Sequence, residues 1–259
     1  MTPVVLHHGL FGFGNLRFGP LALRYFAGGI ERAIREAGHP LILGRSHPTG
    51  SVELRARQLK ATIRKQLSGV RATNGRIGRM IILAHSMGGL DARFMISRLG
   101  MAEHVAALVT ICTPHRGSPY ADWVLANLGQ RLGGARLASL LRLDLQAISD
   151  LTIEATRRFN LQTPDHPSVR YFSISADCAP RRLAPMFLHP AVIIRQQEGP
   201  NDGLVSIRSA AWGEHLETWP VDHLHAINKR LTPRTLQPEH DVTPRYCRLL
   251  EVVTRAVQR

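Results

Sequence analysis

One stretch of the sequence, MIILAHSMGGLDARFM at residues 80–95, limits the possible folds more than any other. An apolar run leads directly into Ala-His-Ser-Met-Gly-Gly, and a helical pattern begins there without a linker. A strand that turns so abruptly into a helix strains the backbone at its central residue, so Ser86 needs small residues two positions away on either side. Ala84 and Gly88 meet that demand. The pattern predicts a strand–serine–helix turn, and it makes Ser86 a candidate nucleophile.

The rest of the chain repeats this alternation of apolar runs and amphipathic stretches. Near-continuous runs of Val, Ile and Leu predict strands buried on both faces, and their alternation with helices is typical of a parallel sheet covered on both sides. We therefore expect one α/β domain over residues 1–259, with a mostly parallel sheet of about six strands. The predicted strands are Val4–His8, Leu41–Gly44, Met80–Ala84, Ala106–Cys112, Val169–Ser175 and Leu216–Pro220, and the predicted helices are Ala27–Ala37, Val52–Leu67, Met87–Leu99 and Pro244–Val257.

The segment between the strands at 106–112 and 169–175 is too long for a simple crossover connection. Within it, residues 128–148 place several leucines on one helical face, with arginines elsewhere. Two interpretations stay open: an ordinary packed helix, or a helical cap or lid over an apolar site. In the second case the insertion lies around residues 118–165.

The first predicted strand ends in a glycine-rich loop, VVLHHGLFGFGN at residues 4–15. Glycines allow the backbone to approach a substrate closely, so the amides of this loop are candidates for binding an oxyanion. We expect the two donors to be the backbone N–H of Leu10 and that of Met87, the residue after the candidate nucleophile. A phosphate-binding loop is a poor alternative, because the glycine spacing differs from G-x-G-x-x-G and no GK[ST] follows.

A serine hydroxyl needs a neighbouring base, and the base needs an acid that orients it. In sheets of this kind the acid and then the histidine follow the serine along the chain. The stretch TWPVDHLHAIN at residues 218–228 offers His223 and His225 as bases. Asp177, at the end of a predicted strand, and Asp202, in a turn-forming Asn-Asp-Gly sequence, are the candidate acids. Asp222, next to His223 in the sequence, is a weaker candidate, because it points elsewhere if the loop is extended.

Five blocks of the sequence resemble the bacterial family I triacylglycerol lipases, which are α/β-hydrolases. The blocks are PVVLHHGLFGFGN, AHSMGGLDARF, TPHRGS, NDGLVSIRSAAWG and DHLHAIN, and they follow the order of the family between Pro3 and Asn228. The resemblance implies an α/β-hydrolase fold, with Asp202 as the acid and His223 as the base. It also implies a serine carboxylester hydrolase, a lipase or esterase that works through an acyl-enzyme intermediate.

The sequence departs from the family at His225, which stands where those lipases carry an aspartate that helps to hold a structural calcium. An imidazole is a poor ligand for Ca²⁺, which prefers hard oxygen donors. We therefore expect no metal and no cofactor. The three cysteines, Cys112, Cys178 and Cys247, are far apart and odd in number, so we expect neither a disulfide framework nor a metal site from them.

Leu10, Phe11 and Phe13 in the glycine-rich loop suggest an apolar acyl chain, and His85 is a further candidate for the substrate pocket, although core packing would also explain the aromatic rings. The ester could be a triglyceride, another lipid ester, a short-chain ester or an aliphatic polyester. An acyltransferase or a thioesterase would use the same catalytic residues. A non-enzymatic alternative is a basic binding protein on this scaffold, and the presence of all three catalytic candidates argues against it.

The chain carries 33 basic and 19 acidic residues, a net charge of +14. The arginines are scattered, without aromatic residues between them, so we expect a solvated basic surface and no specific nucleic-acid partner. Such a surface favours adsorption to anionic lipid interfaces.

No apolar run approaches the roughly 18 residues of a membrane span, and no signal-peptide pattern is visible. Both a cytoplasmic protein and a secreted mature form are compatible with these features.

Overall fold

The computed structural model describes residues 2–12, 16–18, 21–68, 78–130, 145–232 and 235–258. Within these ranges a six-stranded sheet has the order β4-β1-β5-β6-β7-β8, and every neighbouring pair is parallel. The strands are β1 (Val4–His7), β4 (Leu41–Leu43), β5 (Met80–His85), β6 (Val105–Ile111), β7 (Arg170–Ala176) and β8 (Glu214–Trp219). A separate antiparallel hairpin pairs β2 (Leu16–Phe18) with β3 (Leu21–Leu23).

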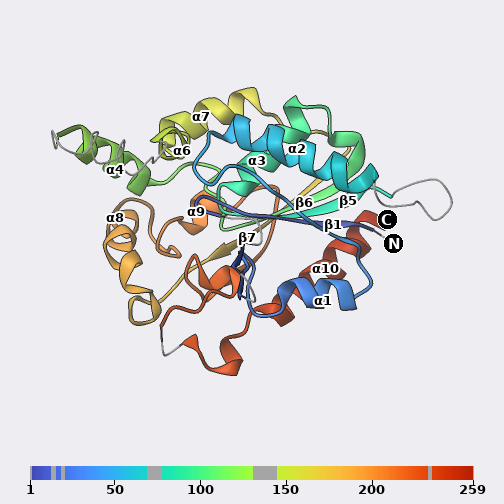
Figure 1. The fold of residues 1–259 in the computed structure, drawn as a ribbon. Coiled ribbons are helices and arrows are strands. Elements are labelled where there is room, and N and C mark those ends of the chain that lie inside the picture. Colours follow the sequence, from blue (N-terminus) through green and yellow to red (C-terminus); the bar gives the residue numbers. More distant parts are fainter. Residues whose placement is uncertain are drawn as a thin grey trace.

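Helices cover both faces of the sheet (Figure 1). On one face lie α1 (Ile30–Glu36) and α10 (Thr243–Gln258), and on the other lie α2 (Val52–Ser68) and α3 (Gly88–Arg98). Successive residues of a strand point to opposite faces, so each strand contributes to two cores. In β1, Val4 belongs to the core beneath α1 and α10, whereas Val5 belongs to the core beneath α2 and α3. The predicted parallel sheet with helices on both faces is confirmed.

The remaining helices lie in the two long connections that flank β7. Between β6 and β7 are α4 (Pro119–Gln130), α6 (Leu145–Ser149) and α7 (Ile153–Gln162), and between β7 and β8 are α8 (Leu188–Glu198) and α9 (Ile207–Ala210). Helices α4 and α8 contact each other at one end of the sheet (Figure 1). Short 3-10 turns cover Ala102–His104, Pro180–Arg182, Pro185–Phe187, His225–Ile227 and Pro238–His240.

The predicted insertion around residues 118–165 falls only partly within the described residues. Residues 131–144, which hold most of the leucine-rich face, lie outside them, so a cap or lid stays a prediction. The sequence pattern does not predict α8, because its apolar residues face both inward and outward: Ile194 is buried, whereas Leu188 and Val192 are exposed. None of the described helices combines the length and the apolar character that a membrane span requires.

Candidate active site

The candidate nucleophile occupies a strained turn between β5 and α3. Ser86 has a φ of 55°, in the left-handed region, which costs a non-glycine residue about 1–2 kcal/mol. Its amide donates to the carbonyl of Ile111 at the end of the neighbouring strand, at 2.9 Å. A Cβ atom added to Gly88 would lie only 2.6 Å from the carbonyl oxygen of His8. The turn therefore needs the small residue that the sequence provides there.

Three predicted catalytic side chains form one hydrogen-bonded line. Oγ of Ser86 lies 2.9 Å from Nε2 of His223, and Nδ1 of His223 lies 2.7 Å from Oδ2 of Asp202. The other carboxylate oxygen of Asp202 accepts the amides of Leu204 and Val205, each at 2.8 Å. Asp202 is fully buried, and Ser86 keeps only 8% of its surface exposed. The carboxylate is thus fixed by its own turn, with one oxygen directed at the imidazole.

The two other carboxylates near this line are occupied elsewhere. Asp177 accepts the amide of Asn201 at 3.0 Å. Asp222 accepts the amide of His225 at 2.8 Å, in the manner of a turn cap. The structure therefore brings Asp202, and neither of these rivals, into hydrogen-bond contact with the imidazole of His223.

Two backbone amides next to Ser86 are available for an oxyanion. Among the residues that the structure describes, neither the amide of Leu10 nor that of Met87 donates to another protein group. Phe11, with a φ of 53°, donates its own amide to the carbonyl of Pro48 at 2.8 Å, which holds the loop beside the site. Phe13 lies outside the described residues.

A buried tyrosine connects the glycine-rich loop with the histidine loop. The hydroxyl of Tyr25 accepts the amide proton of Gly9 at 3.0 Å and donates to Nδ1 of His85 at 2.8 Å. Nε2 of His85 donates to the carbonyl of His223 at 3.0 Å. Burial, reinforced by the neighbouring His223, lowers the pKa of His85 well below its ordinary value, so the ring is neutral and can play both roles. We expected His85 in the pocket wall, and the structure places it beneath the site instead.

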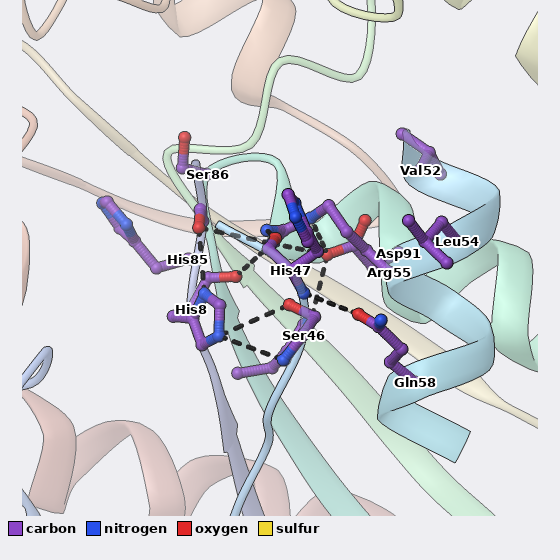
Figure 2. A network of polar contacts seen from close by, with 12 residues as sticks. His8, Ser46, His47, Val52, Leu54, Arg55, Gln58, His85, Ser86 and Asp91 are labelled. Atoms are coloured by element: carbon purple, nitrogen blue, oxygen red, sulfur yellow. Dashed lines mark hydrogen bonds and ion pairs between the residues drawn. The ribbon is translucent and has the colours of Figure 1, made fainter. Parts of the chain in front are cut away.

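A buried ion pair holds the start of the glycine-rich loop (Figure 2). Nε of Arg55, on α2, donates to Oδ2 of Asp91, on α3, at 2.9 Å. The same guanidinium donates to the carbonyl oxygens of His8 and Gly9, at 2.8 and 3.3 Å. Both charged side chains are fully buried. Nε2 of His7 also lies 2.8 Å from Oδ2 of Asp91, but burial lowers the pKa of His7, so Arg55 is the cation that compensates the carboxylate. Arg55 therefore fixes the backbone immediately before the candidate oxyanion donor.

Ser86 opens into a cavity of about 460 Å³. This volume lies within the range of about 300–1,000 Å³ that is usual for small-molecule sites. The polar residues in its wall are Tyr25, Ser118, Tyr120, His223 and Lys229. The other lining side chains, apart from Ser86, are apolar: Leu10, Phe11, Pro114, Ala121, Val124, Ile148, Leu151, Met186, Phe187, Pro190, Leu204, Val205 and Leu224.

One group of potential metal ligands includes two of the catalytic candidates. Within the described residues, Cys112, Asp202 and His223 bring potential ligand atoms within 4.8 Å of one another, but the latter two already form a hydrogen bond. Burial raises the pKa of the Cys112 thiol well above its ordinary value, which disfavours the thiolate that binds metals. His225 donates from Nε2 to the carbonyl of His240 at 2.6 Å, so its imidazole closes the loop itself. All three cysteines are free thiols.

The parallel sheet and the strained serine turn between β5 and α3 define an α/β-hydrolase. Comparison with known proteins shows which named proteins the chain is similar to. Residues 48–169 match the PGAP1-like alpha/beta domain. The chain is 35% identical over 212 residues to triacylglycerol lipase 2 of Saccharomyces cerevisiae, in an alignment that covers 80% of this chain and 63% of the yeast protein. It is 27% identical to the triacylglycerol lipase of Pseudomonas fragi, over 92% of this chain and 94% of that protein.

Solved structures agree on the fold. The mature lipase BlEst2 of Bacillus licheniformis superimposes with a TM-score of 0.68 at 23% identity, covering 93% of this chain and 92% of that one. The metagenomic carboxyl esterase MGS0156 gives a TM-score of 0.71 at 19% identity, covering 99% of this chain and 75% of that one. The chain therefore has an α/β-hydrolase fold and is similar to lipases, and it spans 63% of the length of its yeast relative.

Proposed function

We propose that this chain hydrolyses carboxylic esters with apolar acyl groups, as a lipase or esterase. The observation that carries the proposal is the Ser86–His223–Asp202 line at the base of a largely apolar cavity, with two uncommitted amides beside it. The triacylglycerol lipases to which the chain is similar support the same activity.

In the proposed reaction His223 takes the proton of Ser86 on Nε2 while Oγ attacks the ester carbonyl. Asp202 holds the imidazole through Nδ1 and stabilises its cationic form. The amides of Leu10 and Met87 donate to the tetrahedral oxyanion, and the loss of one such donor typically costs about 10²–10³ in rate. His223 then gives its proton to the leaving alcohol. Water, activated by the same imidazole, hydrolyses the acyl-enzyme and restores the serine.

The surface around the cavity favours adsorption of the protein to a lipid surface that holds its substrate. Five exposed apolar side chains belong to the glycine-rich loop, α4, α8 and the turn before α8, and two of them, Phe11 and Met186, also line the cavity. The other three are Trp123, Leu188 and Val192. Together with the net charge of +14, they support adsorption to anionic lipid. Sedimentation with phosphatidylglycerol vesicles tests this, and binding that is equal on neutral vesicles and insensitive to salt would contradict the electrostatic part.

The activity is tested with p-nitrophenyl esters from acetyl to palmitoyl, compared with the corresponding acyl-CoA thioesters and with an alcohol added as a competing acceptor. The proposal predicts release of free acid from the oxygen esters and no turnover by Ser86→Ala. Faster turnover of the thioesters would favour a thioesterase. Transfer of the acyl group to the alcohol in preference to water would favour an acyltransferase. Release of soluble oligomers from an aliphatic polyester film would extend the substrate range to polymers.

A further inference from the structure

One side chain in the cavity wall does not fit an apolar pocket. Lys229 lines the same cavity as Ser86, and it is the only Lys, Arg, Asp or Glu among the described lining residues. It directly follows Asn228, which has a φ of 64° and is anchored by a 2.6 Å hydrogen bond to Asp241. A rigid left-handed turn thus sets the direction in which the lysine leaves the backbone.

The ammonium group of Lys229 has no carboxylate partner among the described residues. The ammonium group contacts the face of the Tyr25 ring, whose centroid lies 5.0 Å from Nζ. Such a contact contributes about 0.5–2 kcal/mol, which is less than a well-placed anion provides when the site is closed to water. Burial lowers the pKa of the half-buried Lys229, as expected for a cation that lacks a counter-charge.

Lys229 lies at the histidine end of the cavity. The hydroxyl of Tyr25 is fixed by hydrogen bonds to Gly9 and His85, and His85 is bonded to the backbone of His223. Because the ammonium stands over that ring, it belongs to the part of the cavity formed by the glycine-rich loop and the histidine loop. The leaving oxygen of an ester receives its proton from His223, so the alcohol part of the substrate must pass this end.

Most of the other lining side chains are apolar and suit the acyl chain. Val124 of α4, Ile148 of α6 and Pro190 of α8 are among them. An anionic group would be costly against these side chains, because an apolar side chain does not compensate a charge. The cavity therefore combines apolar side chains that suit an acyl chain with one cation that suits an anionic group.

We propose that Lys229 binds an anionic group, a phosphate or a carboxylate, on the alcohol part of the ester, so that anionic lipid esters are the preferred substrates. This inference rests on the proposed ester hydrolase function and adds the charge of the substrate to it. The opposing interpretation is that the apolar stem of the lysine merely covers the wall while the ammonium reaches water. The two differ in whether Lys229 discriminates between charged and neutral esters.

The test compares a 1-acylglycerol 3-phosphate with the 1-monoacylglycerol of the same acyl chain, as monomers below their micellar concentrations. The measured quantity is the ratio of kcat/KM for the phosphate ester to that for the neutral ester. Lys229→Met should lower this ratio at least about ten-fold, the usual effect of losing one charge-assisted hydrogen bond, and Lys229→Arg should keep most of it. Lys65→Met, which removes the same charge from an exposed site on α2, should leave the ratio unchanged.

A carboxylate on the alcohol part, as in an acyl glycolate compared with the neutral ethyl ester, distinguishes a general anion site from one restricted to phosphate. The inference is overturned if Lys229→Met changes charged and neutral substrates in parallel. It is also overturned if the only preference is for a carboxylate at the far end of the acyl chain. If the unaltered chain hydrolyses the neutral ester but the ratio does not depend on Lys229, the proposed hydrolase function stands and the role of Lys229 is refuted. If the chain hydrolyses none of the esters, the hydrolase function and the role of Lys229 are both refuted.

Discussion

The hydroxyl of Tyr25 lies 2.8 Å from Nδ1 of His85, and this contact joins two loops that are more than two hundred residues apart. Tyr25 holds the amide of Gly9, one residue before the proposed oxyanion donor, and His85 holds the backbone carbonyl of His223. A single neutral chain of hydrogen bonds therefore sets the position of the oxyanion loop relative to the base. Its role is positioning, because neither Tyr25 nor His85 supplies or removes a proton in the proposed reaction.

Removal of the Tyr25 hydroxyl should lower both the turnover number and the stability of the fold. Tyr25→Phe leaves the amide of Gly9 and Nδ1 of His85 without a partner, which costs about 1–3 kcal/mol of stability. We expect kcat on a neutral p-nitrophenyl ester to fall about ten-fold or more, since a misplaced oxyanion donor loses part of its effect. Urea unfolding and steady-state kinetics measure the two quantities.

Tyr246→Phe is the matched control for that experiment. The hydroxyl of Tyr246 is also buried and donates to the carbonyl of Ala226 at 2.9 Å, and it makes no hydrogen bond with the described residues of the glycine-rich loop. This variant should lose comparable stability and keep its kcat. Equal losses of kcat in the two variants would show that the Tyr25 hydroxyl matters only for folding.

Breaking the buried ion pair should destabilise the chain strongly, and removing both partners should restore part of the loss. Arg55→Met leaves the buried Asp91 carboxylate without its cation and with only the contact to Nε2 of His7, at a cost of about 3–5 kcal/mol. The double variant Arg55→Met with Asp91→Leu should be more stable than the single one. Urea midpoints of the four proteins in this cycle give the coupling between the residues, and strict additivity would contradict a direct pairing.

Part of this arrangement could be predicted from the sequence, because it depends on local patterns. The alternation of apolar strands and helices predicts the sheet, and the short turn around Ser86 predicts the serine at its edge. The carboxyl ends of parallel strands meet at one edge of a sheet, so residues such as Asp202 and His223 can be expected beside that serine. Asp202 and His223 are far from Ser86 in the sequence, and the order of the strands in the sheet brings the three residues together.

The supporting residues could not be predicted in the same way. Arg55 lies on the apolar stripe that α2 presents to the core, with Ala56 and Leu59 beside it, and a charge in that position signals a buried partner. Nothing in the sequence identifies that partner as Asp91 on another helix. Tyr25 carries no motif, and its contact with His85 depends on how the connection after the glycine-rich loop folds back.

Stability should fall as the pH drops from about 6.5 to about 5, because buried histidines resist protonation. Burial lowers the pKa of His7, His8, His85, His115 and His225 below the ordinary value of 6.5, and that of His8 to about 3. In this window the unfolded chain binds protons that the folded chain does not bind. Each such histidine therefore lowers the free energy of unfolding by up to about 1.4 kcal/mol for each unit by which the pH falls. Urea midpoints between pH 8 and pH 5 measure the slope, and a flat profile would contradict this assignment.

Chelation should not inactivate the protein. His225 already closes the histidine loop by donating to the carbonyl of His240, and an imidazole in that position is a poor ligand for calcium. Esterase activity after dialysis against a chelator should equal that of an untreated sample. A loss that added Ca²⁺ restores would show that other oxygen ligands hold a metal and would overturn our expectation of a metal-free loop.

The most direct test of the proposed catalytic line is covalent labelling with a fluorophosphonate probe, located by peptide mass spectrometry. The proposed Ser86–His223–Asp202 line predicts one adduct, on Ser86, and a labelling rate that falls by about a thousand-fold or more in His223→Ala, because the serine then lacks its base. His225→Ala should be labelled at nearly the rate of the unaltered chain. Absence of an adduct on Ser86 in the folded protein, or labelling that survives His223→Ala and disappears in His225→Ala, would contradict the account.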